Sequence, residues 1–193
     1  MPQDLSSTAA SARGPKSSNT RGAKGSSTHD GANGGPINGN VTARTGRRTQ
    51  VRRSGVHGKG VFALTRFRAG DTIMEYIGEI ITWKEALRRH PHDPNDPNHT
   101  FYFHIDDKNV IDGKHFGNSA KWINHSCDGN CEADEVDGRI FIRALRNIAA
   151  GEELSYDYGL IIDERYTAKL KAAYPCWCNS KNCRGTLLAP KKR

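Results

Sequence analysis

Residues 117–127 read GNSAKWINHSC and residues 151–159 read GEELSYDYG. In the first segment, small residues lead to the adjacent pair Asn124 and His125, a pattern typical of one or two helical turns followed by a buried polar network. In the second, a turn at residues 151–152 leads into a predicted strand over residues 153–158. Together with the short strands expected around them, these segments predict a mostly β domain with short helical connections.

The flanking elements can be predicted in the same way. Residues 54–63, SGVHGKGVFA, indicate a glycine-rich turn that runs into a short strand, and residues 71–81 are predicted to form one strand. Thr82 and Glu85 match a capping box that opens a short helix through about Arg89. Strands are also expected at 100–105, 110–112 and 139–144, the last after a hairpin turn at 137–138. Asp163 is expected to cap a helix over 164–173, which Pro175 ends.

Positive charge is concentrated at the N-terminal end. Residues 1–53 hold nine Lys or Arg and two Asp, whereas the other 140 residues hold 20 Lys or Arg and 19 Asp or Glu. Residues 1–46 are rich in Ser, Gly, Ala, Thr and Asn, with too few large apolar side chains to offset the entropy of ordering, so we predict a disordered basic arm. Such an arm is typical of a solvated tail or of weak contact with nucleic acid.

Five cysteines indicate a metal site, and nothing indicates a membrane. Cys176, Cys178 and Cys183 lie close together in the sequence. In a cytosolic or nuclear protein this spacing favours zinc over disulfides, and a structural zinc takes four ligands, so the fourth is either Cys127 or Cys131. No apolar run approaches the roughly 20 residues of a membrane span, and no apolar signal-peptide core begins the chain.

Four segments resemble the SET-domain family, in that family's order: residues 54–63, residues 75–81 (EYIGEII), residues 117–127 and residues 151–159. The pattern CxCxxxxCRG at 176–185 resembles the post-SET element that follows some SET domains. The resemblance implies a SET-domain β-clip with a pseudoknot-like crossing, in which residues 117–127 thread beneath residues 151–159. It implies a SET domain at 47–160, followed at 161–193 by a C-terminal helix and a small zinc-bound post-SET segment.

The same resemblance implies an activity. Members of this kind are protein-lysine N-methyltransferases of the histone-lysine type, which use S-adenosylmethionine, release S-adenosylhomocysteine and act on flexible lysine-bearing tails such as those of histones. The expected location is the cytoplasm or nucleus or, for a bacterial source, a host nucleus reached by a secreted effector. One alternative is a catalytically silent SET module that binds lysine-containing peptides. Another is a zinc-containing nucleic-acid binder, which is disfavoured because residues 54–193 are almost neutral.

The resemblance also assigns residues. Tyr158, Tyr76 and Tyr156 are the candidate catalytic residues: Tyr158 faces the methyl-transfer centre, Tyr76 lies across the lysine channel, and Tyr156 limits the room for further methyl groups, which favours mono- or dimethylation. Without the family, the three would be interpreted as core residues. The predicted cofactor contacts are His57, Gly58, Lys59, Gly60, Phe103, Asn124, His125 and Tyr158, with core packing the alternative for Phe103. The predicted zinc ligands are Cys127, Cys176, Cys178 and Cys183, which leaves Cys131 to pack as a small hydrophobe.

Overall fold

The computed structural model describes residues 46–90 and 100–191, so the predicted arm over residues 1–46 lies almost wholly outside the described residues. The strands are β1 (Thr49–Arg53), β2 (Lys59–Ala63), β3 (Thr72–Tyr76), β4 (Glu79–Thr82), β5 (Tyr102–His104), β6 (Asn109–Asp112), β7 (Asn124–His125), β8 (Cys131–Val136), β9 (Arg139–Ala144) and β10 (Ser155–Tyr156). The helices are α1 (Trp83–Arg89), the 3₁₀ helix η2 (Ser119–Trp122) and α2 (Ala168–Ala173). No described helix is long and apolar enough to span a membrane.

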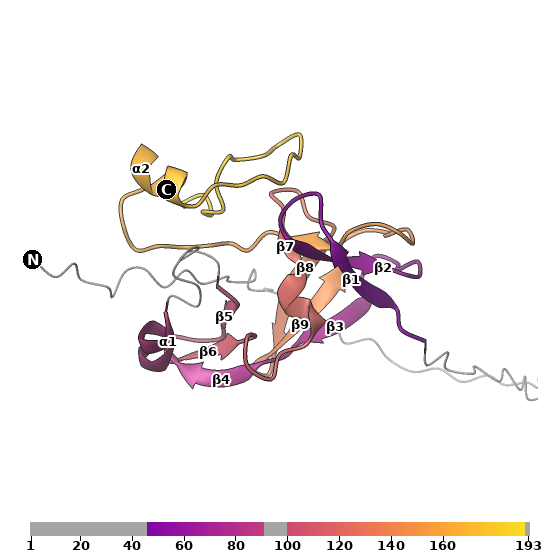
Figure 1. Ribbon diagram of the computed structural model, residues 1–193, viewed down its shortest axis with the longest axis horizontal. Coiled ribbons are helices and arrows are strands. Elements are labelled where there is room, and N and C mark those ends of the chain that lie inside the picture. Colours follow the sequence, from indigo (N-terminus) through magenta and orange to yellow (C-terminus); the bar gives the residue numbers. More distant parts are fainter. Residues whose placement is uncertain (1–45, 91–99, 192–193) are drawn as a thin grey trace, which may run out of the picture.

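The strands form small sheets that share one core. Strands β1 and β2 form a hairpin, β3–β9–β8 and β4–β6–β5 are three-stranded sheets, and β7 pairs with β10 (Figure 1). Sheets this small are not independently stable, so they depend on a common apolar cluster. Val61, Ile142, Ile148 and Leu154 are completely buried in that cluster. The predicted mostly β fold is confirmed.

The parallel pair β7–β10 brings together the two segments that open the sequence analysis. Asn124 pairs with Ser155, and His125 pairs with Tyr156. About thirty residues separate the partners along the chain, so this pairing is a crossing of distant segments and not a local turn. It fixes the polar pair of β7 beside the aromatic residues of β10.

Two local predictions are confirmed by the backbone. Thr82 caps α1, because its hydroxyl oxygen accepts a hydrogen bond of 3.2 Å from the Glu85 backbone N–H. The β8–β9 hairpin turns at Asp137 and Gly138, with φ angles of 51° and 75°. Positive φ at both turn residues matches the twist of the strands that they join.

Three predicted boundaries were wrong. Residues 71–81 form two strands instead of one, because β3 pairs with β9 whereas β4 pairs with β6. The break falls at Gly78, where a Cβ atom would lie 2.5 Å from the backbone oxygen of Asp112. Helix α2 begins only at Ala168, and Thr167 caps it in place of Asp163 by accepting a 3.1 Å hydrogen bond from the Leu170 N–H. The strand predicted over 153–158 is limited to β10.

Candidate active site

A cavity of about 650 Å³ lies between the glycine-rich turn, the β7–β10 crossing and the C-terminal segment. It is lined by seven of the residues predicted as catalytic or cofactor-binding, with Tyr156 as the eighth. These are His57, Gly58, Lys59, Tyr76, Asn124, His125, Tyr158 and Tyr156. Residues far apart in the sequence therefore meet around one space large enough for a small molecule.

Two predicted cofactor contacts do not line the cavity. Phe103 is 2% exposed and packs in the core with its ring centroid 5.2 Å from that of Tyr76 and 6.3 Å from that of Tyr156. Its assignment as a cofactor contact is corrected to core packing behind the two tyrosines. Gly60 is buried in β2, and a side chain there would collide with the carboxylate of Glu153. Gly60 thus allows Glu153 to approach the turn.

Asn124 anchors the glycine-rich turn. Its side-chain amide nitrogen lies 3.0 Å from the backbone oxygen of Lys59, 3.3 Å from that of His57 and 2.8 Å from a carboxylate oxygen of Glu153. The same carboxylate accepts a 2.7 Å hydrogen bond from the hydroxyl of Ser54, at the start of the turn. Asn124 and Glu153 therefore fix the backbone carbonyls that form this wall of the cavity.

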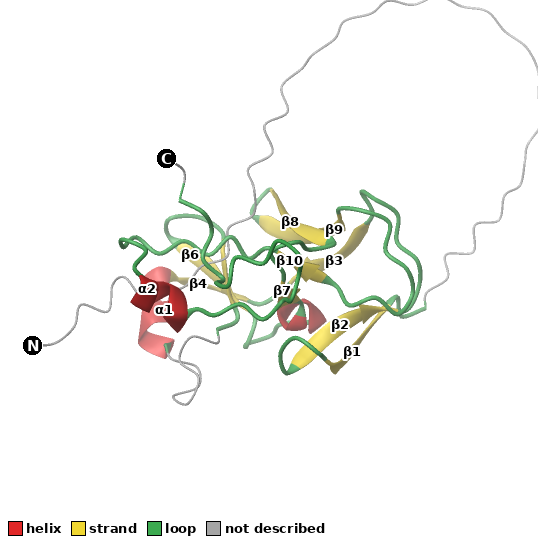
Figure 2. Cartoon of the chain, turned by 90° about the horizontal axis from the view of Figure 1, so that it is seen from above, coloured by secondary structure: helices red, strands yellow, loops and turns green. Residues whose placement is uncertain are grey.

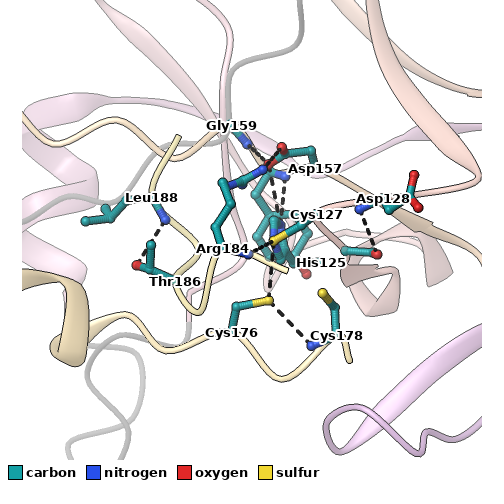
Figure 3. A network of polar contacts seen from close by, with 12 residues as sticks. His125, Cys127, Asp128, Asp157, Gly159, Cys176, Cys178, Arg184, Thr186 and Leu188 are labelled. Carbon is teal, nitrogen blue, oxygen red and sulfur yellow. Dashed lines mark hydrogen bonds and ion pairs between the residues drawn. The ribbon is translucent and has the colours of Figure 1, made fainter. Parts of the chain in front are cut away.

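His125 is neutral and connects the crossing to a cysteine. Burial lowers the pKa of His125 to about 4, so its ring carries one proton near neutral pH. Its Nδ1 atom accepts a 3.1 Å hydrogen bond from the backbone N–H of Tyr158, which leaves the proton on Nε2. Nε2 lies 3.4 Å from the Sγ atom of Cys127, so its N–H points at a sulfur atom (Figure 3).

The three candidate tyrosines form an aromatic wall. The ring centroids of Tyr156 and Tyr158 are 5.1 Å apart, and Tyr158 packs edge-on against His125. The hydroxyl of Tyr76 donates a 2.8 Å hydrogen bond to the backbone oxygen of Phe101. Burial raises the pKa of all three phenols above its usual value, so they remain uncharged at neutral pH. Among the residues that the structure describes, the hydroxyl of Tyr156 has no hydrogen-bond partner.

The four predicted zinc ligands meet at one point. The sulfur atoms of Cys127, Cys176, Cys178 and Cys183 all lie within 4.8 Å of one another, and all five cysteines are free thiols. The sulfurs of Cys127 and Cys176 are 3.8 Å apart, which is also about the separation of two thiolates bound tetrahedrally at about 2.3 Å from a zinc ion. The donor set therefore fits zinc. Cys131 is 1% exposed and lies in the core, outside this cluster.

Polar groups around the cysteine cluster hold it against β10. The guanidinium of Arg184 forms a bidentate pair with Asp157, at 2.6 and 2.8 Å. The backbone N–H of Arg184 donates to the Cys127 sulfur, and the N–H of Cys178 donates to the Cys176 sulfur, each at 3.4 Å. Figure 3 shows these contacts joining the C-terminal segment to the crossing.

The C-terminal segment closes the cavity, and sequence reasoning missed its contribution. Trp177, between two cysteines of the cluster, stacks on His57 with ring centroids 6.0 Å apart and an interplanar angle of 15°. Tyr174 also lines the cavity, and Trp122 does so with its ring below the ammonium groups of Lys59 and Lys121. The available signal was the position of Trp177 within CWC, because a residue between two metal ligands is held rigidly.

Comparisons with known proteins agree with this geometry. Histone-lysine N-methyltransferase set1 of Dictyostelium discoideum is 37% identical to this chain over 73% of its length. Histone-lysine N-methyltransferase, H3 lysine-4 specific, of Saccharomyces cerevisiae is 40% identical over 70%. The chain spans only 9% and 13% of those two relatives.

A solved structure gives the same result for the fold. The structure of ctPRC2 in an autoinhibited conformation bound to S-adenosylmethionine matches with a TM-score of 0.53 and 30% identity. The match covers 57% of this chain and 15% of that one. The family model for the SET domain matches residues 58–159, which is just over half of the chain. The chain therefore belongs to the SET-domain family.

Proposed function

We propose that this protein transfers a methyl group from S-adenosylmethionine to a lysine side chain of a protein substrate, probably best represented by a histone tail. The observation that carries the proposal is the aromatic wall of Tyr76, Tyr156 and Tyr158, which shares one cavity with the Asn124-anchored turn. The relatives named as histone-lysine N-methyltransferases and the neighbour bound to S-adenosylmethionine support the same reaction.

The wall suits an amine substrate because the amine must be neutral to react. A free lysine has a pKa of about 10.4 and is almost fully protonated at neutral pH. Three buried rings exclude water, and exclusion of water favours the uncharged amine. The hydroxyl of Tyr156, which has no hydrogen-bond partner among the described residues, can accept a hydrogen bond from the amine and occupies space that further methyl groups would need. We therefore expect mono- or dimethylation.

The turn and the crossing suit the methyl donor. When bound, S-adenosylmethionine supplies a sulfonium-borne methyl group that the lone pair of a neutral amine displaces. The backbone carbonyls of His57 and Lys59, fixed by Asn124, form the wall that would orient the donor. Tyr158 is held at both its hydroxyl and its N–H, so its ring position varies little between the two substrates. Catalysis then rests on positioning and on exclusion of water.

The four-cysteine cluster would hold one structural zinc ion. Its thiolates come from the crossing and from the C-terminal segment, so a bound ion would fasten that segment over the cavity. A zinc ion with four thiolate ligands has no open position for a substrate. We therefore assign zinc to the integrity of the cavity and not to the chemical step.

Two measurements on the full chain test the proposed function. Calorimetry should detect S-adenosylmethionine binding at one site per chain, and labelled methyl groups should pass to a lysine in a mixture of histones. Donor binding without transfer to any histone, together with binding of lysine-containing peptides, would instead support the catalytically silent module. Failure to bind the donor would contradict both interpretations.

A further inference from the structure

The positive charge of the described domain is segregated at its N-terminal end. Residues 71–193 hold 17 Lys or Arg and 19 Asp or Glu, so they carry a small negative charge. Residues 46–70 contain no Asp or Glu. Their basic residues are Arg47, Arg48, Arg52, Arg53, Lys59, Arg66 and Arg68. A domain that is almost neutral as a whole therefore has one strongly basic element, which the net charge conceals.

The hairpin β1–β2 displays these arginines on its outer surface. Val51 pairs with Val61, which is fully buried, so alternate residues of β1 face away from the core. Arg48, Gln50 and Arg52 lie on this outer side and are exposed. In both views the hairpin lies at the end of the molecule opposite α1 and α2 (Figures 1 and 2).

Two of the guanidinium groups are held in place by aromatic rings. The guanidinium carbon of Arg48 lies 4.3 Å from the ring centroid of Phe67, and that of Arg52 lies 4.2 Å from the ring centroid of Phe62. Stacking of this kind orients the planar guanidinium and reduces the entropy lost when it binds a second group. These side chains are therefore ordered while their N–H donors remain exposed.

Little of this charge is neutralised within the domain. Among residues 46–90 and 100–191, the basic residues of the hairpin form one ion pair, between Arg48 and Asp71 at 3.8 Å. Elsewhere in the same domain, arginines such as Arg89 and Arg139 form short pairs with carboxylates, at 2.7 Å to Glu79 and 2.5 Å to Glu75. Exposed arginines without carboxylate partners favour an external polyanion.

We propose that the basic hairpin face, defined as Arg47, Arg48, Arg52, Arg53, Arg66 and Arg68, binds the phosphate backbone of double-stranded DNA. This proposal does not depend on the methyltransferase reaction. Single-stranded nucleic acid is disfavoured because it needs exposed rings on which bases stack, whereas Phe67 is fully buried and Phe62 lies under Arg52. A membrane surface is disfavoured because the outer side of β1 carries no large apolar side chain to insert.

The test measures binding of the full chain to a labelled DNA duplex by fluorescence anisotropy, at salt concentrations from about 50 to about 200 mM. The test variant carries Arg52→Gln, Arg53→Gln and Arg66→Gln. The matched control carries Arg165→Gln, Lys169→Gln and Lys171→Gln, which removes the same charge from an exposed site around α2. Because each lost phosphate contact lowers the salt dependence by about one unit, the hairpin variant should lose a slope of about 2 to 3 and bind at least about tenfold more weakly at low salt. The control should stay within about twofold of wild type.

Thermal unfolding verifies that both variants are folded. If the first hairpin variant is not, the combination of Arg47→Gln, Arg66→Gln and Arg68→Gln preserves the Arg52–Phe62 contact and should give the same loss. Equal losses in the hairpin and control variants would overturn the proposal, because net charge alone would then explain binding. It would also be overturned if neutralising Arg13, Lys16 and Arg21 abolished binding while the hairpin variant bound normally, or if phosphatidylserine vesicles bound the hairpin more tightly than the duplex.

Discussion

The phenolic hydroxyl of Tyr158 donates a hydrogen bond of 2.8 Å to the backbone carbonyl oxygen of Ile123. Ile123 directly precedes β7, and Tyr158 follows β10, so this bond spans the crossing on the cavity side. The backbone N–H of Tyr158 makes a second link, to Nδ1 of His125. The position of the Tyr158 ring is therefore set by the crossing itself, and the crossing and the site form a single arrangement.

Asn124→Ala should weaken binding of S-adenosylmethionine about tenfold. The substitution removes the side-chain amide that holds the carbonyls of His57 and Lys59, and loss of about 1.4 kcal/mol of such hydrogen bonding corresponds to a factor of ten. Calorimetry measures the Kd. The control is Asn147→Ala, which removes a side chain that accepts a hydrogen bond from the Ala69 N–H away from the cavity. An unchanged Kd in Asn124→Ala would show that the turn needs no anchor.

Purified protein should contain one zinc ion per chain. Cys178→Ser should lose it, because three thiolates cannot complete the tetrahedral site, whereas Cys131→Ala should keep it, because Cys131 lies in the core. Elemental analysis measures the zinc content. Chelation should also loosen the small apolar cluster that contains Leu160, Tyr174 and Leu188. Full zinc occupancy in Cys178→Ser would rule out the four-cysteine site.

The folded protein should lose stability above pH 10. Burial raises the pKa of five tyrosines above the ordinary value of about 10. These are Tyr76, Tyr102, Tyr156, Tyr158 and Tyr174. Since the folded state holds these protons more tightly than the unfolded chain, their contribution to the unfolding free energy is constant below pH 10 and decreases as the pH rises further. Phenolate absorbance should therefore rise together with loss of circular dichroism. Ionisation of these tyrosines near pH 10 in a protein with native dichroism would contradict the burial of the aromatic wall.

Gly129→Ala should destabilise the crossing. A Cβ atom at this position would lie 2.6 Å from the backbone oxygen of Ser155 and 2.7 Å from the Cα of Tyr156, and neither backbone atom can move without disturbing β10. Overpacking of this kind costs roughly 1–3 kcal/mol. Urea denaturation measures the loss. The matched control is Gly55→Ala, since a Cβ atom there meets nothing within 4 Å. Equal stability of the two variants would refute the close packing of the crossing.

Local sequence signals predicted the elements whose causes are themselves local. The cap of Thr82 and the turn at Asp137 and Gly138 depend on residues within one helical turn or one hairpin, and both form as predicted. The break between β3 and β4 could not be predicted in that way. It depends on the approach of the Asp112 backbone to Gly78, and that contact arises only once β4 pairs with β6.

The candidate site shows the same division. The sequence alone left Cys127 and Cys131 open as the fourth zinc ligand, and only the family resemblance favoured Cys127. The two residues are four positions apart, but β8 carries Cys131 into the core while Cys127 faces the C-terminal cysteines. Phe103 was predicted to contact the cofactor, because nothing in its local sequence distinguishes a ring that faces a cavity from one that packs behind the cavity wall.

The most direct test of the central claim compares methyl transfer by wild type, Tyr158→Phe and Tyr166→Phe, with mass spectrometry of histone lysines as the readout. Tyr166 does not line the cavity, so its substitution controls for loss of a phenol elsewhere. We predict methylation by wild type, a rate within about twofold of wild type for Tyr166→Phe, and a rate about 100-fold lower for Tyr158→Phe, because a small displacement at the reacting centre has an effect of that size. Transfer at the full wild-type rate by Tyr158→Phe would contradict the account.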